Sequence, residues 1–216
     1  MKNKISSLEK MLLLSVAFSM LLLTVRIIIT HELSYIFYAW NTFLAIVPLL
    51  FSRRLSKQLS FNFKAIVLIV CWLLFLPNAP YIVTDIFHYM KRPPVPMWYD
   101  LLIVMIATWN GLLLGFISLL QVEQFLTSYL KPFWVKASVI VSLILCGYGV
   151  YLGRFLRFNS WDILTNPDDL FFASARTIIH PHQSIKAWAF TFLFASMLSI
   201  IYFTIKQLPR LYERGK

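Results

Sequence analysis

Charged side chains are scarce in this sequence: only 13% of its 216 residues are charged, whereas 59% are hydrophobic. A typical soluble domain is about one quarter charged and about half apolar, so the composition excludes an ordinary soluble protein. Aromatic residues make up 17% of the chain, and Trp and Tyr collect at the two boundaries of a bilayer. The sequence therefore predicts an integral membrane protein.

Cysteines and catalytic motifs are also few or missing. The two cysteines, Cys71 and Cys146, lie in apolar segments, where a cysteine usually acts as a small hydrophobic residue. A disulfide framework or a thiol–metal site needs more cysteines at closer spacing. Neither H-E-x-x-H nor G-x-S-x-G occurs, and these motifs are typical of zinc peptidases and serine hydrolases. We expect no cofactor, and the sequence assigns no catalytic residue.

A dense basic stripe is absent too, although the net charge is +11. Nucleic-acid-binding domains gather their Lys and Arg on one face, whereas many of these residues lie here between long apolar segments. Basic residues beside membrane spans set topology and contact anionic lipid head groups. We therefore expect membrane lipids as partners and no nucleic acid, and protein partners stay unassigned.

Long apolar segments predict the fold class: an all-α integral membrane bundle of about six transmembrane helices. A bilayer core of about 30 Å needs about 20 apolar residues per helix. The spans are expected at about 10–30, 35–51, 65–83, 98–120, 136–152 and 185–205, within a single domain over 1–216. Basic residues precede the first segment and no cleavage site follows it, which predicts an uncleaved first span.

Orientation follows from the distribution of positive charge. With the N-terminus inside, most of the 20 Lys and Arg residues lie on the inner side. Because cytoplasmic loops carry the excess of Lys and Arg, we expect both termini in the cytoplasm. All four histidines and most of the nine acidic residues then lie on the outer side, so a site of mixed chemistry is expected there.

The segment "LPNAPYIVTD" interrupts the third span with Pro77 and Pro80. A proline inside a helix removes a backbone hydrogen bond. At membrane depth, broken backbone is tolerated only where it is buried in protein or lines a wet cavity. We expect residues 76–80 to face the interior of the bundle near its outer mouth. The alternative is that the span ends at Leu76 and the prolines begin a loop, followed by a short interfacial helix.

A polar pocket is expected beside this break. Asp85 and His88 share a helical face, Asp100 begins the fourth span, and Arg154 and Arg157 end the fifth. Charges this close to hydrocarbon are costly unless they pair, reach the interface or line a cavity. The walls would come from the third span, the start of the fourth, the end of the fifth and the loop beyond. The candidate set is Asn78, Asp85, His88, Asp100, Arg154, Arg157, Asn159 and Asp162.

The roles of these side chains have alternatives. The arginines could reach lipid phosphates, pair with nearby carboxylates or bind the anionic group of a ligand. Asp85 and His88 could hold a metal with His180 and His182, but no recognised zinc motif is present, and we expect none.

Glycines are few, but five of the six lie in the fourth and fifth spans. They include two G-x-x-x-G motifs, "GLLLG" at 111–115 and "GVYLG" at 149–153. Small residues at this spacing let helix backbones approach closely in lipid. We therefore expect a close antiparallel contact between these two spans.

The last outer loop contains a predicted helix start. Asn166 suits the N-cap and Pro167 the first turn, and two aspartates meet the positive end of the helix dipole. Pro181 ends the helix, and Phe171 and Ile178 lie on one apolar face. We expect a short interfacial helix along the membrane surface.

Four motifs together resemble a family of small bacterial multi-span integral membrane proteins known only as a domain of unknown function. They are "LPNAPYIVTD", "RPPVPMWYD", "WNGLLLG" and "YGVYLGRFLRFNSWDILTNP". The resemblance extends from about the third span to the sixth and implies a bacterial inner-membrane protein. It implies no activity, substrate or catalytic residue.

Three function classes follow from the sequence. The first is a structural or assembly role, in which the outer polar cluster locks the fold. The second is binding or transport of a small anionic or lipid-like solute, with the arginines as an anion clamp. The third is an enzyme acting on a lipid-linked substrate, with Asp85 or His88 as general base.

Overall fold

The computed structural model describes residues 7–89 and 93–213, except for the side chains of His88 and residues 209–213. This part is all-α and contains no strand, as predicted. In chain order the helices are α1 (Ser7–Thr30), α2 (Phe37–Leu55), α3 (Phe63–Phe75), α4 (Asn78–Tyr81), the 3-10 helix η1 (Ile82–His88), α5 (Met97–Thr127), α6 (Pro132–Phe155), α7 (Asp162–Thr165), α8 (Pro167–Ile179) and α9 (Ile185–Glu213).

Five helical segments of the described part are long and apolar enough to cross a membrane. They are Ser7–Thr30, Phe63–Phe87, Met97–Thr127, Pro132–Phe155 and Ile185–Leu208. The second expected span, α2, is not among them; it contains Pro48 and ends on Arg53 and Arg54. Many large apolar side chains are exposed, including Leu13 at 61% and Leu193 at 73%. Exposure on this scale marks a surface that meets lipid, so the helices indicate a multi-pass membrane protein.

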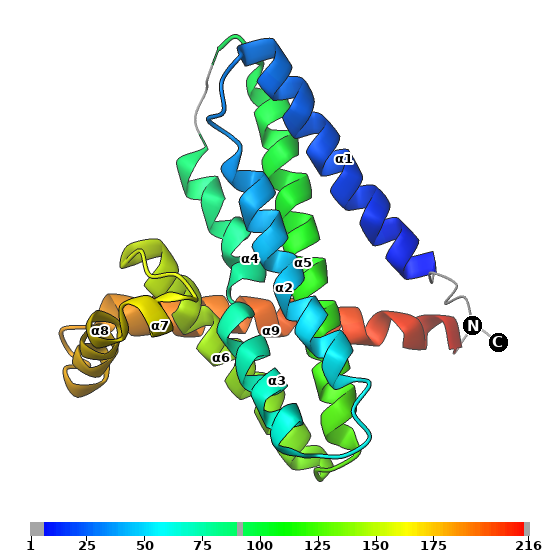
Figure 1. Ribbon diagram of the computed structural model, residues 1–216, viewed down its shortest axis with the longest axis vertical. Helices are drawn as coiled ribbons and strands as arrows, with labels where there is room; N and C mark the ends of the chain where they lie inside the picture. Colours follow the sequence, from blue (N-terminus) through cyan, green and yellow to red (C-terminus); the bar gives the residue numbers. More distant parts are fainter. Residues whose placement is uncertain (1–6, 90–92, 214–216) are drawn as a thin grey trace.

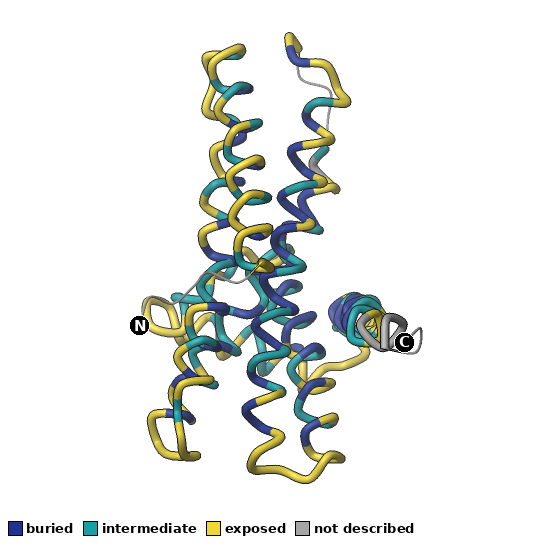
Figure 2. The backbone as a smooth tube through the Cα atoms, turned by 90° about the vertical axis from the view of Figure 1, so that its right-hand side faces the viewer, coloured by how far each residue is buried: buried dark blue, intermediate teal, exposed yellow. Residues whose placement is uncertain are grey.

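Most of the helices run along the long axis of the molecule (Figure 1). The α1–α2 connection and the segment before α5 lie at one end, and the α2–α3 and α5–α6 connections lie at the other. The last helix, α9, runs across this axis and is seen nearly end-on when the molecule is turned by 90° (Figure 2). The polypeptide thus alternates between two ends from α1 to α6, whereas α9 crosses the bundle at a wide angle.

The core is centred on α5, which contributes to both of the buried apolar clusters. One cluster joins α5 to α3, α6 and α9 around Trp72, which is 1% exposed. The Trp72 indole N–H donates to the Ser118 hydroxyl at 3.0 Å, so this buried polar group is satisfied. The other cluster joins α5 to α1, α2 and α4. Among the five candidate spans α5 is the most buried, because 56% of its most apolar segment is buried.

The interrupted third span stays helical through its prolines. Pro77 has helical φ and ψ of −59° and −26°, and the Tyr81 backbone N–H donates to the Pro77 carbonyl at 3.1 Å. Leu76 and Ala79 are 3% and 0% exposed, and Pro80 is buried. The expectation that residues 76–80 face the interior is confirmed, and the alternative of a loop after Leu76 is wrong.

The glycines of α5 and α6 pack against this interrupted segment. Gly111 and Gly115 on α5 contact Ala79, whereas Gly149 and Gly153 on α6 contact Pro77 and the Tyr81 ring. The remaining α6 glycine faces the backbone of α9. The two helices, α5 and α6, do contact each other as expected, but not through the two G-x-x-x-G faces, which both pack against the interrupted segment. The proline-bent helix lies between the two glycine faces. Its backbone can approach α5 and α6 closely there because glycine has no side chain.

A helix does form in the loop before α9, as predicted: α8 begins at Pro167 and ends at Ile179. Asn166 occupies the N-cap position, but its side chain makes no capping bond. Instead its amide nitrogen donates to the Asp169 carboxylate at 2.9 Å. The exposed Phe171 and Ile178 form part of its apolar surface.

Candidate functional site

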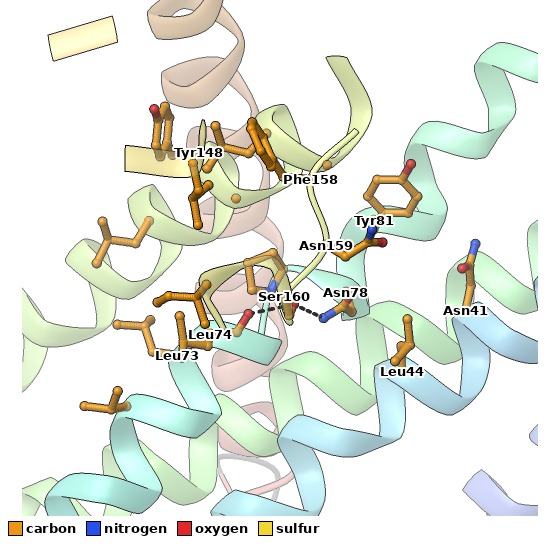
Figure 3. A pocket seen from close by; sticks show the side chains of 18 of the residues that line it. Asn41, Leu44, Leu73, Leu74, Asn78, Tyr81, Tyr148, Phe158, Asn159 and Ser160 are labelled. Carbon is orange, nitrogen blue, oxygen red and sulfur yellow. Dashed lines mark hydrogen bonds between the residues drawn. The ribbon is translucent and has the colours of Figure 1, made fainter. Parts of the chain in front are cut away.

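A cavity of about 440 Å³ lies beside the interrupted segment, between α2, α3, α4, α6 and the loop after α6 (Figure 3). Its polar lining includes Asn41, Asn78, Asn159 and Ser160, and the rest is mainly Leu, Val, Tyr, Trp and Pro. Among residues 7–89 and 93–208, no charged residue with a described side chain lines it. In Figure 3 the three asparagines gather toward one side of the view, away from Leu73, Leu74 and Phe158. The cavity is therefore apolar with one neutral polar region.

The polar region is built by the helix break itself. The backbone bonds shift at the break, where the Ala79 N–H donates to the Leu76 carbonyl at 3.1 Å instead of the Phe75 carbonyl, so carbonyl groups at the end of α3 lose their usual partners. The Ser160 hydroxyl donates to the Leu74 carbonyl at 3.0 Å, and the Asn78 amide donates to the Phe75 carbonyl at 2.9 Å. Asn78 also donates to the Ser160 hydroxyl at 2.8 Å. Side chains thus replace the missing backbone bonds, as burial in a membrane requires.

Asp85 and Arg154 form a nearly buried ion pair behind this region. The Arg154 Nη1 lies 3.1 Å from Asp85 Oδ1, and the two side chains are 10% and 5% exposed, respectively. Arg154 also donates to the Thr84 carbonyl, and its Nη1 lies 3.5 Å from the Tyr81 hydroxyl. Asn41 donates to Asp85 Oδ2 at 3.3 Å. The structure therefore joins two of the predicted residues, and connects them to the cavity lining through Asn41 and Tyr81.

Asp100 belongs to a second, separate cluster at the end of α1. Its carboxylate pairs with Arg26, with 2.6 Å between Nε and Oδ1 and 3.3 Å between Nη2 and Oδ2. Both side chains are 1% exposed. The Arg26 guanidinium also lies 3.7 Å from the Tyr35 ring centroid and donates to Ser34. The start of α5, which we expected to line the pocket, does not do so, and Asp100 lies outside its lining.

The remaining predicted residues occupy the outer loop and the end of η1. Asn159 lines the cavity, and its backbone N–H donates to Asp162 at 2.6 Å. Arg157 is exposed, with a φ of 63°, and makes no ion pair or hydrogen bond within residues 7–89 and 93–213. The side chain of His88 lies outside the described residues. Among the described residues no group of three or more His, Cys, Asp or Glu could hold a metal ion.

Sequence reasoning missed two contributors to these clusters. Asn41 is a polar residue inside an otherwise apolar α2, which is a signal that was present but not used. Trp40, beside it, lines the cavity and meets Trp161 edge-on, with ring centroids 6.3 Å apart. The helix α2 is therefore a wall of the cavity, in addition to the walls that we expected.

Arg154→Gln and Arg157→Gln form a matched pair of changes. The first removes the Arg154 guanidinium from the buried Asp85 carboxylate, so we expect the free energy of unfolding to fall by about 2 kcal/mol. The second removes an exposed charge, and we expect a change within about 0.5 kcal/mol. Denaturant titration in mixed micelles measures both free energies. Equal losses in the two variants would contradict the distinction between these arginines.

These features define a multi-pass α-helical membrane protein with a neutral cavity beside an interrupted helix and, in its described part, two nearly buried ion pairs outside that cavity. The chain belongs to the family described as "Protein of unknown function (DUF1361)", which matches residues 40–201. The matched region contains every residue that lines the cavity and leaves out α1. No curated protein and no solved structure matches the chain.

Proposed function

We propose that this protein binds a lipid-like amphiphile in the cavity, and that the two buried ion pairs lock the surrounding helices. The observation that carries the proposal is a cavity of about 440 Å³ with an apolar lining and no charged residue. Pockets for small ligands are mostly apolar, with a few polar groups that fix orientation. An apolar chain would occupy the leucine-rich side, and a polar head would meet the asparagines.

Access from the membrane supports a lipid-like ligand over a water-soluble one. Four apolar residues of the cavity lining, namely Trp40, Val70, Leu145 and Ile163, are themselves exposed. In a bilayer such side chains contact acyl chains. A lipid chain could therefore enter sideways without crossing a polar barrier.

The other function classes account for less of the structure. An assembly role accounts for the ion pairs but does not account for the cavity. An anion clamp requires free arginines at the ligand, whereas Arg154 is already paired with Asp85 and neither Arg154 nor Arg157 lines the cavity. An enzyme needs a base near its substrate, and among the side chains that the structure describes no acid or histidine lines the cavity.

For the membrane topology, we propose six spans in a single domain over 1–216, in a bacterial inner membrane, with both termini in the cytoplasm. One feature supports this orientation. Arg53, Arg54, Lys57 and Lys131 lie at or beside the connections at one end of the bundle, as cytoplasmic loops require. Accessibility of single introduced cysteines to a membrane-impermeant reagent tests this arrangement.

Photo-crosslinking tests the binding proposal. The full chain is placed in phosphatidylcholine vesicles with a monoacylglycerol that carries a photoreactive acyl chain, and in parallel with the phosphate ester of that probe. We expect at least one probe to label peptides of α3 and α6 around the cavity. Leu145→Trp should reduce this labelling about tenfold, because Leu145 lines the cavity and the larger ring fills it.

Val141→Trp is the matched control. Val141 lies one turn earlier on α6, is 52% exposed against 44% for Leu145, and does not line the cavity. Labelling should therefore remain unchanged in this variant. If both tryptophan variants label like the native chain, the cavity is not the binding site.

A further inference from the structure

The hydrogen-bonding groups of the cavity define the chemistry of the head group, given the amphiphile-binding function proposed above. The nitrogen of each lining asparagine is already engaged. Asn41 donates to the Asp85 carboxylate, Asn78 to the Phe75 carbonyl and the Ser160 hydroxyl, and Asn159 to the Asp162 carboxylate. Asn78 thus uses both of its amide N–H groups, whereas Asn41 and Asn159 each use one and keep one.

The orientation of these amides is fixed by partners that can only accept. Carboxylates and backbone carbonyls offer no hydrogen, so each must face an amide nitrogen rather than an amide oxygen. Ser160 likewise must donate to the Leu74 carbonyl, which leaves its oxygen to accept from Asn78. Only one orientation of each asparagine amide and one donor direction of Ser160 satisfy these hydrogen bonds together.

Three acceptor atoms are left over. The Oδ1 atoms of Asn41, Asn78 and Asn159 have no hydrogen-bond partner among the described residues, and all three residues line the cavity. The lining donors that remain are neutral: the hydroxyls of Tyr81 and Tyr148, the indole of Trp40 and the second amide N–H of Asn41 and Asn159. A hydroxyl group both donates and accepts, so it satisfies the amide oxygens and these neutral donors together.

A phosphate or carboxylate head does not fit this set of groups. An ionised oxygen cannot donate, so it would face the amide oxygens with no hydrogen between them. Burying a charge without a counter-charge is also costly. Arg154 is taken up by Asp85, the Thr84 carbonyl and the Tyr81 hydroxyl, and neither Arg154 nor the exposed Arg157 lines the cavity.

We infer that the cavity selects amphiphiles with an uncharged, hydroxyl-bearing head, such as an acylglycerol or a long-chain alcohol, over their phosphorylated counterparts. The amide oxygens bind the hydroxyl hydrogens, and the Leu side receives the chain. The cavity thus recognises the dephosphorylated member of a lipid pair.

The two photoreactive probes described above test this selectivity, because they share one chain and differ only in the phosphate. Labelling of the cavity peptides is divided by labelling of α1, whose exposed Leu13 and Ile28 report how much probe is in the membrane. We expect the monoacylglycerol to label the cavity about tenfold more strongly than its phosphate, the difference that one charged hydrogen-bonding mismatch produces.

Asn159→Arg supplies a second readout, because it places a cation at an exposed position of the cavity lining. The ratio of monoacylglycerol labelling to phosphate labelling should fall about tenfold in this variant. It should stay unchanged in the control Asn166→Arg, because Asn166 is an exposed position outside the cavity. A native chain that prefers the phosphate or binds both probes equally would overturn the selectivity while leaving amphiphile binding intact. Absence of any labelling sensitive to Leu145→Trp would overturn both.

Discussion

Asp100→Asn is expected to lower the free energy of unfolding by about 3–5 kcal/mol, the usual effect of removing one member of a buried ion pair. The change leaves the Arg26 guanidinium, 1% exposed, without a carboxylate. The remaining contacts with Ser34 and the Tyr35 ring do not neutralise its charge. Denaturation in mixed micelles measures the loss.

Two further variants show whether the loss comes from the unpaired charge. Arg26→Leu combined with Asp100→Leu removes both charges, so we expect this double variant to regain most of the stability. Glu9→Gln breaks the Glu9–Arg53 pair, whose side chains are 37% and 41% exposed, and we expect a loss below about 1 kcal/mol. If Asp100→Asn cost no more than Glu9→Gln, the Arg26–Asp100 pair would not hold α1 in place.

Gly111→Ala is expected to lower the free energy of unfolding by about 3 kcal/mol, the upper part of the range for overpacking. A methyl group at Gly111 would overlap the backbone carbonyl oxygen of Ala79, which cannot move without displacing the interrupted helix. In a solvent-exposed helix the same change would raise the free energy of unfolding by about 1 kcal/mol. A loss of stability would therefore indicate that Gly111 packs against the Ala79 backbone. The same micellar denaturation measures it.

Gly153→Ala is the control for this change. A methyl group there would lie 3.1 Å from a carbon of the Tyr81 ring, and a side chain at that distance can shift by a few tenths of an ångström. We expect its effect to stay within about 1 kcal/mol. A Gly111→Ala variant as stable as the native chain would show that α5 and the Ala79 backbone are not in close contact.

Local patterns predicted the elements well. The start of α8 followed from Asn166 and Pro167, and the interior position of the interrupted segment followed from the cost of broken backbone in lipid. Both inferences depend on residues that are close in sequence. They could be made because the physical constraint acts within a few turns of one helix.

Long-range pairings could not be predicted from the same information. Asp100 was considered a partner for Arg154 or Arg157, yet it pairs with Arg26, 74 positions away. Any carboxylate near the outer boundary satisfies any arginine there, so sequence alone leaves the choice open. The G-x-x-x-G motifs identified the faces that pack closely but not what packs on them, because spacing describes one helix and a contact requires two.

The long separation between Arg26 and Asp100 has a consequence for the order of events during synthesis. The ribosome delivers Arg26 in the first helix, and the only carboxylate that pairs with it in the described structure arrives 74 positions later. Until then the guanidinium must be accommodated by water and lipid head groups, toward which long basic side chains extend. We therefore expect α1 to reach its final packed position only after α5 has entered the membrane.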